Sequence, residues 1–421
     1  MDDPLASAKK EHPVPLPDPL RILASLAFCP SLPSETRQNH RGREVVRLMQ
    51  RSLPLFFFLL LFWLTFVPDI HASPSAGFWE DLLPHGDFPI EWWYMTGFLK
   101  TEKGRNLGFQ ATFFRMKNNE QSPDQQSARG PWAPREIFGL HGAVSDLDRK
   151  TFVWTERERR GFGRSVATQD HPFSVSIGRN RLDHKDATAP SLALSFRVAN
   201  QSFDLELTPL SPPVWHAAHK KFFTGPRPVD YAYYYSYPLV NVEGTRTIVH
   251  RNGSVTHERV HGQCWFDHEW MDQSLAPGQI GWIWLWAWNK ENTRAVMLYQ
   301  MLDQGGKLSP FHRATVMKQT KEGISVERTR DVLLLRGMHG GCLELRKIRF
   351  RLDHKMKIGV KPKLKDQLLK GAVRYWEGAA EINFGKETGG DGKGYLEVTG
   401  LTKRAESSSI DDLCQSSAKS R

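Results

Sequence analysis

Short runs of aromatic and β-branched residues, separated by polar turns, follow one another along the chain from about residue 90 onward. Such runs are typical of antiparallel strands, because alternate side chains of a strand lie on opposite faces of a sheet. The segments 91–99 and 107–115 form one predicted hairpin, in which Gly104 supplies the positive φ of the turn. Since only residues 366–373 hint at a helical period, the sequence predicts an all-β protein.

A second series of strands resembles the first. Residues 281–303 begin GWIWLWAW and have the same plan as residues 91–116, which begin EWWYMTGF: a tryptophan-rich strand, a polar turn and an apolar strand. We interpret the two segments as copies of one barrel or sandwich unit, with the boundary near Gly244. The predicted parts are an N-terminal domain at 73–244, a C-terminal domain at 245–402 and a flexible tail at 403–421.

An apolar run at residues 53–67 precedes the strands. It is short for a membrane-spanning helix, which needs about 20 residues. The basic residue Arg51 before the run and the small residue Ala72 after it are typical of a secretory signal peptide. The sequence therefore predicts a signal peptide at 49–72, cleavage after Ala72, and a periplasmic or secreted protein. An uncleaved membrane anchor is the alternative.

The first 48 residues carry scattered Pro, Arg and Ser without apolar periodicity. Signal peptides do not usually begin so far into a chain. We therefore interpret Met49 as the translation start, and residues 1–48 as an untranslated or disordered leader.

Charge and cysteine content narrow the classes of partner. The net charge is +11, and residues 1–72 contribute only +1 of it, so the remainder is basic. Its Lys and Arg residues are dispersed and are not interleaved with aromatic residues, which argues against a nucleic-acid partner and leaves anionic lipid or an acidic partner open. The cysteines beyond the leader are odd in number and widely spaced, so no disulfide is predicted to be required for folding; they are Cys264, Cys342 and Cys414.

The segment HGQCWFDHEWMDQ at 261–273 places ionisable residues in an aromatic strand. Alternation puts His268 and Trp270 on one face, and Asp267 and Glu269 on the other. Buried ionisable groups are costly unless they pair or take part in chemistry. Three interpretations remain open: a polar network that fixes domain docking, an acid–base site with His268 as proton carrier, and a metal site. We predict no metal, because His268 has no second histidine at ligand spacing on its face.

Four tryptophans share one face of the strand at 282–288. Core packing is the simpler interpretation, but such rings also suit the wall of a barrel lumen that holds a flat or polyene-like ligand. We predict an apolar small molecule, lipid- or isoprenoid-like, as the partner. The predicted ligand-binding residues are Trp93, Tyr94, His141, Trp270, Trp282, Trp284 and Trp286.

Glu91 is a single carboxylate beside three aromatic rings in EWWY. We predict that it pairs with a buried arginine such as Arg115, at the end of the apolar strand GFQATFFR. His141 either faces the same lumen or is a hydrogen-bonded core histidine.

Several phrases resemble the lipocalin-like family of AttH-type proteins, often described as secreted hydrolases, and carotenoid 1,2-hydratases. These are FPIEWWYMTGFL, GFQATFFR, YAYYYSYP, CWFDHEWMDQSLAPGQIGWIWLWAW, YWEGAAEI and GKGYLEVTG, between residues 78 and 402. The resemblance implies two lipocalin-like antiparallel β-barrels packed side by side. It also implies a hydratase His-x-Trp element at His268 and Trp270, whereas the Tyr-x-Asp element is matched only by Tyr299, because Met301 stands in place of the Asp.

Two functions of different class follow as expectations. The first is an exported protein that binds the apolar molecule in the lumen and serves a membrane export system for it. The second is a hydratase or hydrolase in which His268 moves protons, Tyr299 shapes the apolar wall, and Asp267 or Glu269 orients the site. A purely structural module is a third possibility if both barrels are packed solid. No cofactor is expected.

Overall fold

The computed structural model of the chain describes residues 81–117, 136–161, 166–169, 173–184, 191–321, 323–385, 389–401 and 412–414. The predicted leader and signal peptide, and most of the predicted tail, lie outside this part of the chain. Within it, no helix has both the length and the apolar character needed to cross a membrane.

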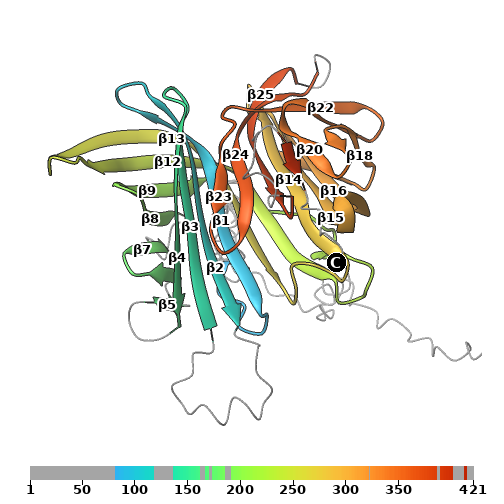
Figure 1. The fold of residues 1–421 in the computed structure, drawn as a ribbon, viewed down its shortest axis with the longest axis horizontal. Helices are drawn as coiled ribbons and strands as arrows, with labels where there is room; N and C mark the ends of the chain where they lie inside the picture. Colours follow the sequence, from blue (N-terminus) through green and yellow to red (C-terminus); the bar gives the residue numbers. More distant parts are fainter. Residues whose placement is uncertain are drawn as a thin grey trace, which may run out of the picture. The chain divides into compact units, whose positions relative to one another are not determined.

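Strands dominate the described residues, which confirms the all-β prediction (Figure 1). The first large sheet has the order β4-β3-β2-β1-β13-β12-β9-β8-β7-β6-β5, with β10 and β11 also paired to β12. Its strands are β1 (Ile90–Thr101), β2 (Asn106–Lys117), β3 (Glu136–Asp146), β4 (Thr151–Arg160), β5 (Val166–Gln169), β6 (Ser174–Ile177), β7 (Asn180–His184), β8 (Leu192–Val198), β9 (Gln201–Pro209), β10 (Val214–Trp215), β11 (Lys221–Phe223), β12 (Tyr231–Val249) and β13 (Val255–Met271).

The second large sheet has the order β17-β16-β15-β14-β25-β24-β22-β21-β18, with β23 beside β24, and a small third sheet has the order β19-β20-β26. Two short 3-10 helices, η4 (Gln304–Gly306) and η5 (Leu345–Lys347), lie between strands. The strands are β14 (Gln279–Asn289), β15 (Arg294–Asp303), β16 (Lys307–Thr320), β17 (Gly323–Thr329), β18 (Val332–Arg336), β19 (Met338–His339), β20 (Cys342–Glu344), β21 (Ile348–Leu352), β22 (Met356–Pro362), β23 (Leu368–Lys370), β24 (Arg374–Asn383), β25 (Asp391–Thr399) and β26 (Asp412–Cys414).

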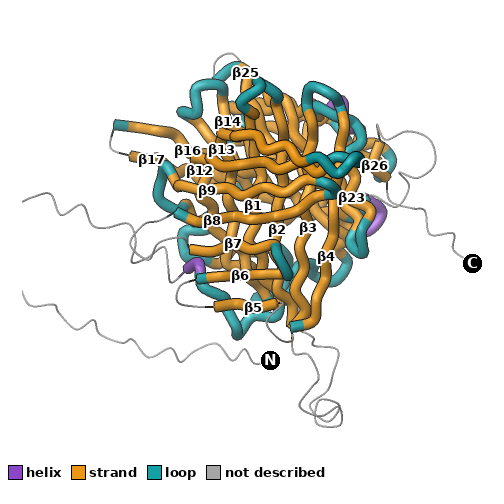
Figure 2. The backbone as a smooth tube through the Cα atoms, turned by 90° about the vertical axis from the view of Figure 1, so that its left-hand side faces the viewer, coloured by secondary structure: helices purple, strands orange, loops and turns teal. Residues whose placement is uncertain are grey.

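Each large sheet curls into a nearly closed antiparallel barrel (Figure 2). Strands near the two ends of each sheet approach each other: β3 and β4 lie against β6 and β8 in the first, and β16 lies against β18 in the second. Curling protects sheet edges whose backbone groups would otherwise be unpaired. The predicted pair of antiparallel barrels is therefore confirmed.

The two barrels repeat one strand plan. In each, a meander of four strands comes first, and the first strand of that meander also pairs with a late strand: β1 with β13, and β14 with β25. The predicted boundary at Gly244 is wrong, because β12 runs through it without a break and β13 still belongs to the first sheet. The chain passes from the first sheet to the second between Met271 and Gln279.

Alternation along the strands sorts the apolar side chains into three clusters. The first barrel encloses one cluster, which includes Trp93 and Phe266. The second barrel encloses another, which includes Leu285 and Leu396. The third cluster joins residues of both sheets, such as Trp265 of β13 and Trp286 of β14, whose rings stack with centroids 5.7 Å apart. The two barrels therefore pack together through the outer faces of β1, β13, β14 and β25.

A disulfide links Cys342 of β20 to Cys414 of β26. It fixes β26 beside β20, where Leu413 is buried in the core of the second barrel. The sequence did not indicate this pair, because 72 residues separate the two cysteines and nothing in their spacing selects them. The structure thus contains one bridge that the sequence did not specify, and Cys264 is a buried free thiol.

Candidate functional site

Alternation along β13 divides the predicted catalytic residues between two places. His268 points into the first barrel, with Trp270, whereas Asp267 and Glu269 point toward the second sheet. Tyr299 of β15 belongs to the cluster between the sheets. The four predicted catalytic residues therefore do not form one constellation.

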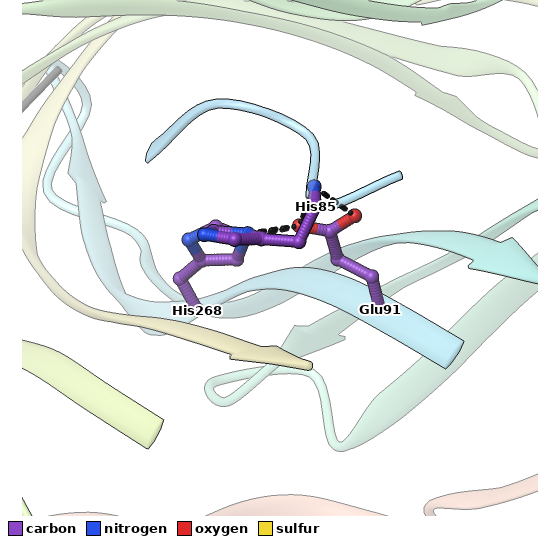
Figure 3. A group of neighbouring side chains, drawn as sticks. All are labelled: His85, Glu91 and His268. Carbon is purple, nitrogen blue, oxygen red and sulfur yellow. Dashed lines mark hydrogen bonds and ion pairs between the residues drawn. The ribbon is translucent and has the colours of Figure 1, made fainter. Parts of the chain in front are cut away.

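Inside the first barrel, His268 meets the glutamate of the EWWY motif (Figure 3). Glu91 Oε1 lies 2.9 Å from His268 Nε2 and 2.9 Å from Nδ1 of His85, a residue of the segment before β1. The backbone N–H of His85 also donates to both Glu91 oxygens. Glu91 and His268 are fully buried, while the side chain of His85 is 22% exposed. The trio thus connects the barrel interior to the surface.

Arg115 completes this cluster and confirms the predicted ion pair. Its Nε donates to Glu91 Oε2 at 2.8 Å, and its Nη1 donates to Glu136 at 2.9 Å. Burial alone would raise the pKa of Glu91, but hydrogen bonds from His268 and His85 and the charge of Arg115 outweigh it and lower the pKa to about 2. Burial lowers the pKa of His268 in spite of Glu91. The charged pair is therefore Glu91 with Arg115.

The interior of the first barrel is filled by its own side chains. Trp93 is fully buried, donates from Nε1 to the Leu82 carbonyl at 3.0 Å, and stacks on His268. Trp270 stacks on His85 with ring centroids 3.6 Å apart. The cavity lined by Tyr237, Phe266 and their neighbours measures about 10 Å³, whereas ligand sites commonly measure about 300–1,000 Å³. Trp93 and Trp270 are core residues here and do not line an open lumen.

The other predicted ligand-binding residues lie between the two sheets, which corrects the prediction that they line a lumen. Trp286 donates to Thr96 across the interface at 2.7 Å, and Trp284 donates to Tyr234 at 3.0 Å. Strand alternation was read correctly, but the tryptophan face of β14 turns outward and Ile283 and Leu285 fill the barrel. The residues found in the interface are Tyr94, His141, Trp282, Trp284 and Trp286.

His141 is a hydrogen-bonded interface histidine. Its Nδ1 lies 2.9 Å from the Tyr375 hydroxyl of the second sheet, and its Nε2 lies 3.2 Å from Glu156. Burial lowers the pKa of His141, although Glu156 opposes this change. Of the two predicted environments of His141, the structure therefore shows that of a hydrogen-bonded, buried histidine.

Asp267 belongs to a polar network that spans the interface. Its carboxylate accepts hydrogen bonds from Ser236, from Tyr234 at 2.9 Å and from Trp265 Nε1 at 2.6 Å, and the Tyr234 hydroxyl in turn accepts from Trp284. Burial raises the pKa of Asp267 to about 7 against the effect of these donors. Of the three interpretations of the segment 261–273, this arrangement around Asp267 matches the polar network that fixes domain docking.

Further carboxyl groups gather on the same interface. Glu377 and Glu397 are directly opposite each other on β24 and β25, and Glu269 approaches from the first sheet closely enough to interact electrostatically with Glu397. Burial raises the pKa of Glu397 to about 8, helped by the charge of Asp267 and opposed by a 3.0 Å hydrogen bond from Trp282 Nε1. Burial also raises the pKa of Glu377, which accepts a hydrogen bond from Tyr94. Like charges in such contact are unfavourable, so these groups retain protons.

This acidic group is surrounded by aromatic rings and reaches solvent. Glu377 is fully buried, but Glu269, Glu397, Trp92 and Trp282 are only half-buried. Rings from both sheets pack around it, with Tyr94 and Trp284 edge to face at 5.2 Å. The interface therefore combines protonated carboxyls, apolar walls and access from outside.

Three residues of these clusters were missed in the sequence: His85, Glu377 and Glu397. His85 lies six residues before Glu91 in HGDFPIEWW, in a segment without strand periodicity. Glu377 and Glu397 each stand alone in an apolar strand, in RYWEGAAEI and GYLEVT. A single acid beside aromatic residues in an apolar strand is also the pattern that singled out Glu91. The same pattern could have identified Glu377 and Glu397 in the sequence.

A surface pocket of about 280 Å³ lies over β21, β22 and β24. None of the predicted site residues lines it. Its polar lining residues are Arg336, Arg346, Lys347, Arg349, Lys361, Glu381, Asn383 and Asp391.

Two barrels of one strand plan, joined through an aromatic and acidic interface, define a tandem lipocalin-like protein. The chain belongs to the AttH-like family, which matches residues 70–401. This confirms the resemblance drawn from the EWWY and DHEW phrases.

Solved structures with the same fold support this assignment. A crystal structure described as AttH from Nitrosomonas europaea is similar at 25% sequence identity and a TM-score of 0.63, over 76% of this chain and 95% of that one. Kievitone hydratase from Nectria haematococca is similar at 13% identity and a TM-score of 0.57, over 78% of this chain and 94% of that one. Comparison with the sequences of curated proteins gives no significant match.

Proposed function

We propose that this protein is a hydratase-type enzyme that binds an apolar, unsaturated small molecule between its two sheets and adds water to a carbon–carbon double bond. One observation carries the proposal: the carboxyl of Glu397, whose pKa is raised to about 8, stands protonated beside indole rings and is still half-buried. A positioned acid with a pKa near the operating pH is what protonation of an alkene needs.

The reaction follows from the groups around Glu397. Glu397 transfers its proton to one alkene carbon, and the neighbouring carbon becomes a cation. The faces of Trp282, Trp284 and Tyr94 stabilise this cation. Water adds to the cation, and its released proton returns to the carboxylate of Glu397, which restores the starting state. Glu269 lies on the opposite wall and holds the water by hydrogen bonding.

The substrate class follows from the lining of the interface. Because its walls are indole and phenol rings, the site favours a lipid- or isoprenoid-like molecule over a charged metabolite. The filled interior of the first barrel argues against storage of such a molecule in the lumen. We therefore propose the interface for the role that the sequence suggested for the lumen, and Glu397 in place of His268 as the proton carrier.

We further propose that the enzyme works outside the cytoplasm. The apolar run at 53–67 and Ala72 fit a signal peptide. The Cys342–Cys414 disulfide supports an oxidising compartment, because such bonds persist in exported proteins and are rare in the cytosol.

The proposal is tested with labelled water. The purified protein is incubated with an apolar lipid extract of its host in ¹⁸O-enriched water, and products are identified by mass spectrometry. We expect one product that carries a single ¹⁸O atom in a new hydroxyl group, and its loss in Glu397→Gln. As a matched control, Glu381→Gln on the neighbouring strand β24 changes an exposed carboxyl and should keep full activity. A labelled product that forms equally in Glu397→Gln would contradict the proposal.

A further inference from the structure

The cluster of His85, Glu91 and His268 has the composition and geometry of a metal centre. The ligand atoms Nδ1 of His85, Oε1 of Glu91 and Nε2 of His268 all lie within 4.8 Å of one another, and both nitrogens are 2.9 Å from the carboxylate oxygen (Figure 3). Ligand atoms that bind a tetrahedral zinc ion at about 2.0–2.1 Å lie about 3.3 Å apart. The three atoms therefore need small adjustments to surround an ion.

The second polar atom of His268 and that of Glu91 each have a hydrogen-bond partner, as the non-coordinating atoms of metal ligands usually do. His268 Nδ1 lies 3.1 Å from the Tyr235 hydroxyl, which donates to the Asp81 carbonyl at 3.2 Å. Glu91 Oε2 accepts from Arg115 Nε at 2.8 Å. Such outer contacts fix the tautomer of the imidazole and the orientation of the carboxylate.

The position between His268 and Glu91 suits either a proton or a metal ion. Without an ion, a proton on His268 Nε2 donates to Glu91 Oε1 at 2.9 Å. With an ion on Nε2, the ring proton moves to Nδ1 and donates to the Tyr235 hydroxyl at 3.1 Å, which still donates to the Asp81 carbonyl. The contacts of His268 therefore accommodate both states.

The charge and the access of the site fit a divalent ion. Arg115 is shared between Glu91 and Glu136, so the two carboxylates exceed the one arginine charge by one. His85 is 22% exposed and stacks on Trp270, which gives an ion and a bound water a route from solvent. Among the described residues, His85, Glu91 and His268 form the group of three possible metal ligands whose ligand atoms lie close together.

We propose that His85, Glu91 and His268 bind a divalent first-row transition-metal ion of the Zn²⁺ class, with water as the fourth ligand. Two imidazole nitrogens and one carboxylate oxygen suit Zn²⁺ and its neighbours and not Mg²⁺ or Ca²⁺, which take oxygen ligands. The site lies inside the first barrel and does not depend on the proposed hydratase reaction. The sequence argument against a metal was the missing second histidine on the face of His268, and His85 supplies it from another segment.

The test is metal binding by the purified, EDTA-treated protein. We expect one Zn²⁺ per chain, measured by equilibrium dialysis and metal analysis, and a thermal midpoint that rises with Zn²⁺ but not with Mg²⁺. His85→Phe keeps a ring on Trp270 and removes Nδ1, so its Zn²⁺ affinity should fall at least tenfold. His268→Gln should do the same.

His354→Phe is the matched control. His354 also pairs with a carboxylate, Asp331, at 2.9 Å, but its side chain is 75% exposed and it does not belong to the three-residue group. It should leave Zn²⁺ binding unchanged. Equal Zn²⁺ affinity in His85→Phe and the unaltered protein would overturn the proposal. A protein that binds no Zn²⁺ would overturn it too, and the trio would then be a hydrogen-bonded network that holds only protons.

Discussion

The two barrels share one strand plan but enclose different chemistry. The registers place Gly281, Leu302 and Val398 of the second barrel at the positions that correspond to Glu91, Arg115 and His268 of the first. The first barrel therefore surrounds an ion pair and two histidines, whereas the core of the second consists of aliphatic and aromatic side chains. The second barrel instead carries two acids, the buried Glu377 and the half-buried Glu397, on its outer face.

This difference shows how one fold can separate structural from chemical roles. A buried charge must be paired, and pairing fixes it in place, so removing one ion of the pair inside the first barrel would leave the other buried at a high cost. Acids that remain unpaired among rings hold protons instead. The interface, where the outer faces of both copies meet, is thus the place suited to proton transfer.

Breaking the ion pair of the first barrel should have the largest effect. Glu91→Gln removes the buried carboxylate of Arg115 and leaves it only the partly exposed Glu136, and we expect the free energy of unfolding to fall by about 3 kcal/mol. Chemical denaturation measures the change. Glu381→Gln, which removes an exposed partner of Lys361, should cost about 0–1 kcal/mol. Similar losses in both variants would contradict the structural role of Glu91.

Reduction of the disulfide should weaken the second barrel. The Cys342–Cys414 bond restricts the unfolded chain across 72 residues and holds Leu413 in the core. Its removal in Cys414→Ala should lower the free energy of unfolding by about 2–4 kcal/mol. Thermal unfolding with and without reductant checks this. The variant should be insensitive to reductant, and a reductant effect of the same size in the variant would exclude the disulfide as its cause.

A histidine placed in the second barrel should be tolerated poorly. Val398→His copies the position of His268, but no carboxylate stands at Gly281 to bond it. We expect a loss of about 1–3 kcal/mol, because a polar ring is buried without a partner. Denaturant titration measures it. An unchanged stability would mean that the apolar interior of the second barrel admits polar groups.

A hydrogen bond between the barrels should contribute least. Ser145 donates to Gln367, which directly precedes β23 of the other sheet, at 2.7 Å, and Ser145→Ala should cost about 1 kcal/mol. Ser195→Ala is the matched control, because Ser195 makes an equally short bond to Asp204 at the exposed surface and should cost almost nothing. If both variants lose the same stability, the interface bond has no special role.

Local patterns predicted much of this protein, and contacts between distant segments were not predictable. Alternation identified the strands, the two copies, and the opposite faces of His268 and Glu269, because these depend on neighbouring residues. It did not say which face turns into a barrel, so Trp284 was assigned to a lumen and lies in the interface. The meetings of His85 with His268 and of Cys342 with Cys414 depend on closure of the sheets, which one sequence does not encode locally.

The sign of the pH dependence follows from the pKa of Glu397. The pKa is raised above the ordinary value of 4.5, so the folded state holds a proton that the unfolded state releases. Stability should therefore fall as pH rises from about 4.5 to about 8, and hydration activity should be lost above about pH 8. Glu397→Gln should remove this part of the pH dependence of stability.

Infrared difference spectroscopy of the carboxyl C=O stretch tests the central claim most directly. At pH 7 the protein should show a protonated-carboxyl band, of which one component is lost as pH rises through about 8 and is missing in Glu397→Gln. A spectrum at pH 6 that is identical in the unaltered protein and in Glu397→Gln would show that Glu397 ionises at its ordinary pKa, and would contradict an acid held ready between the barrels.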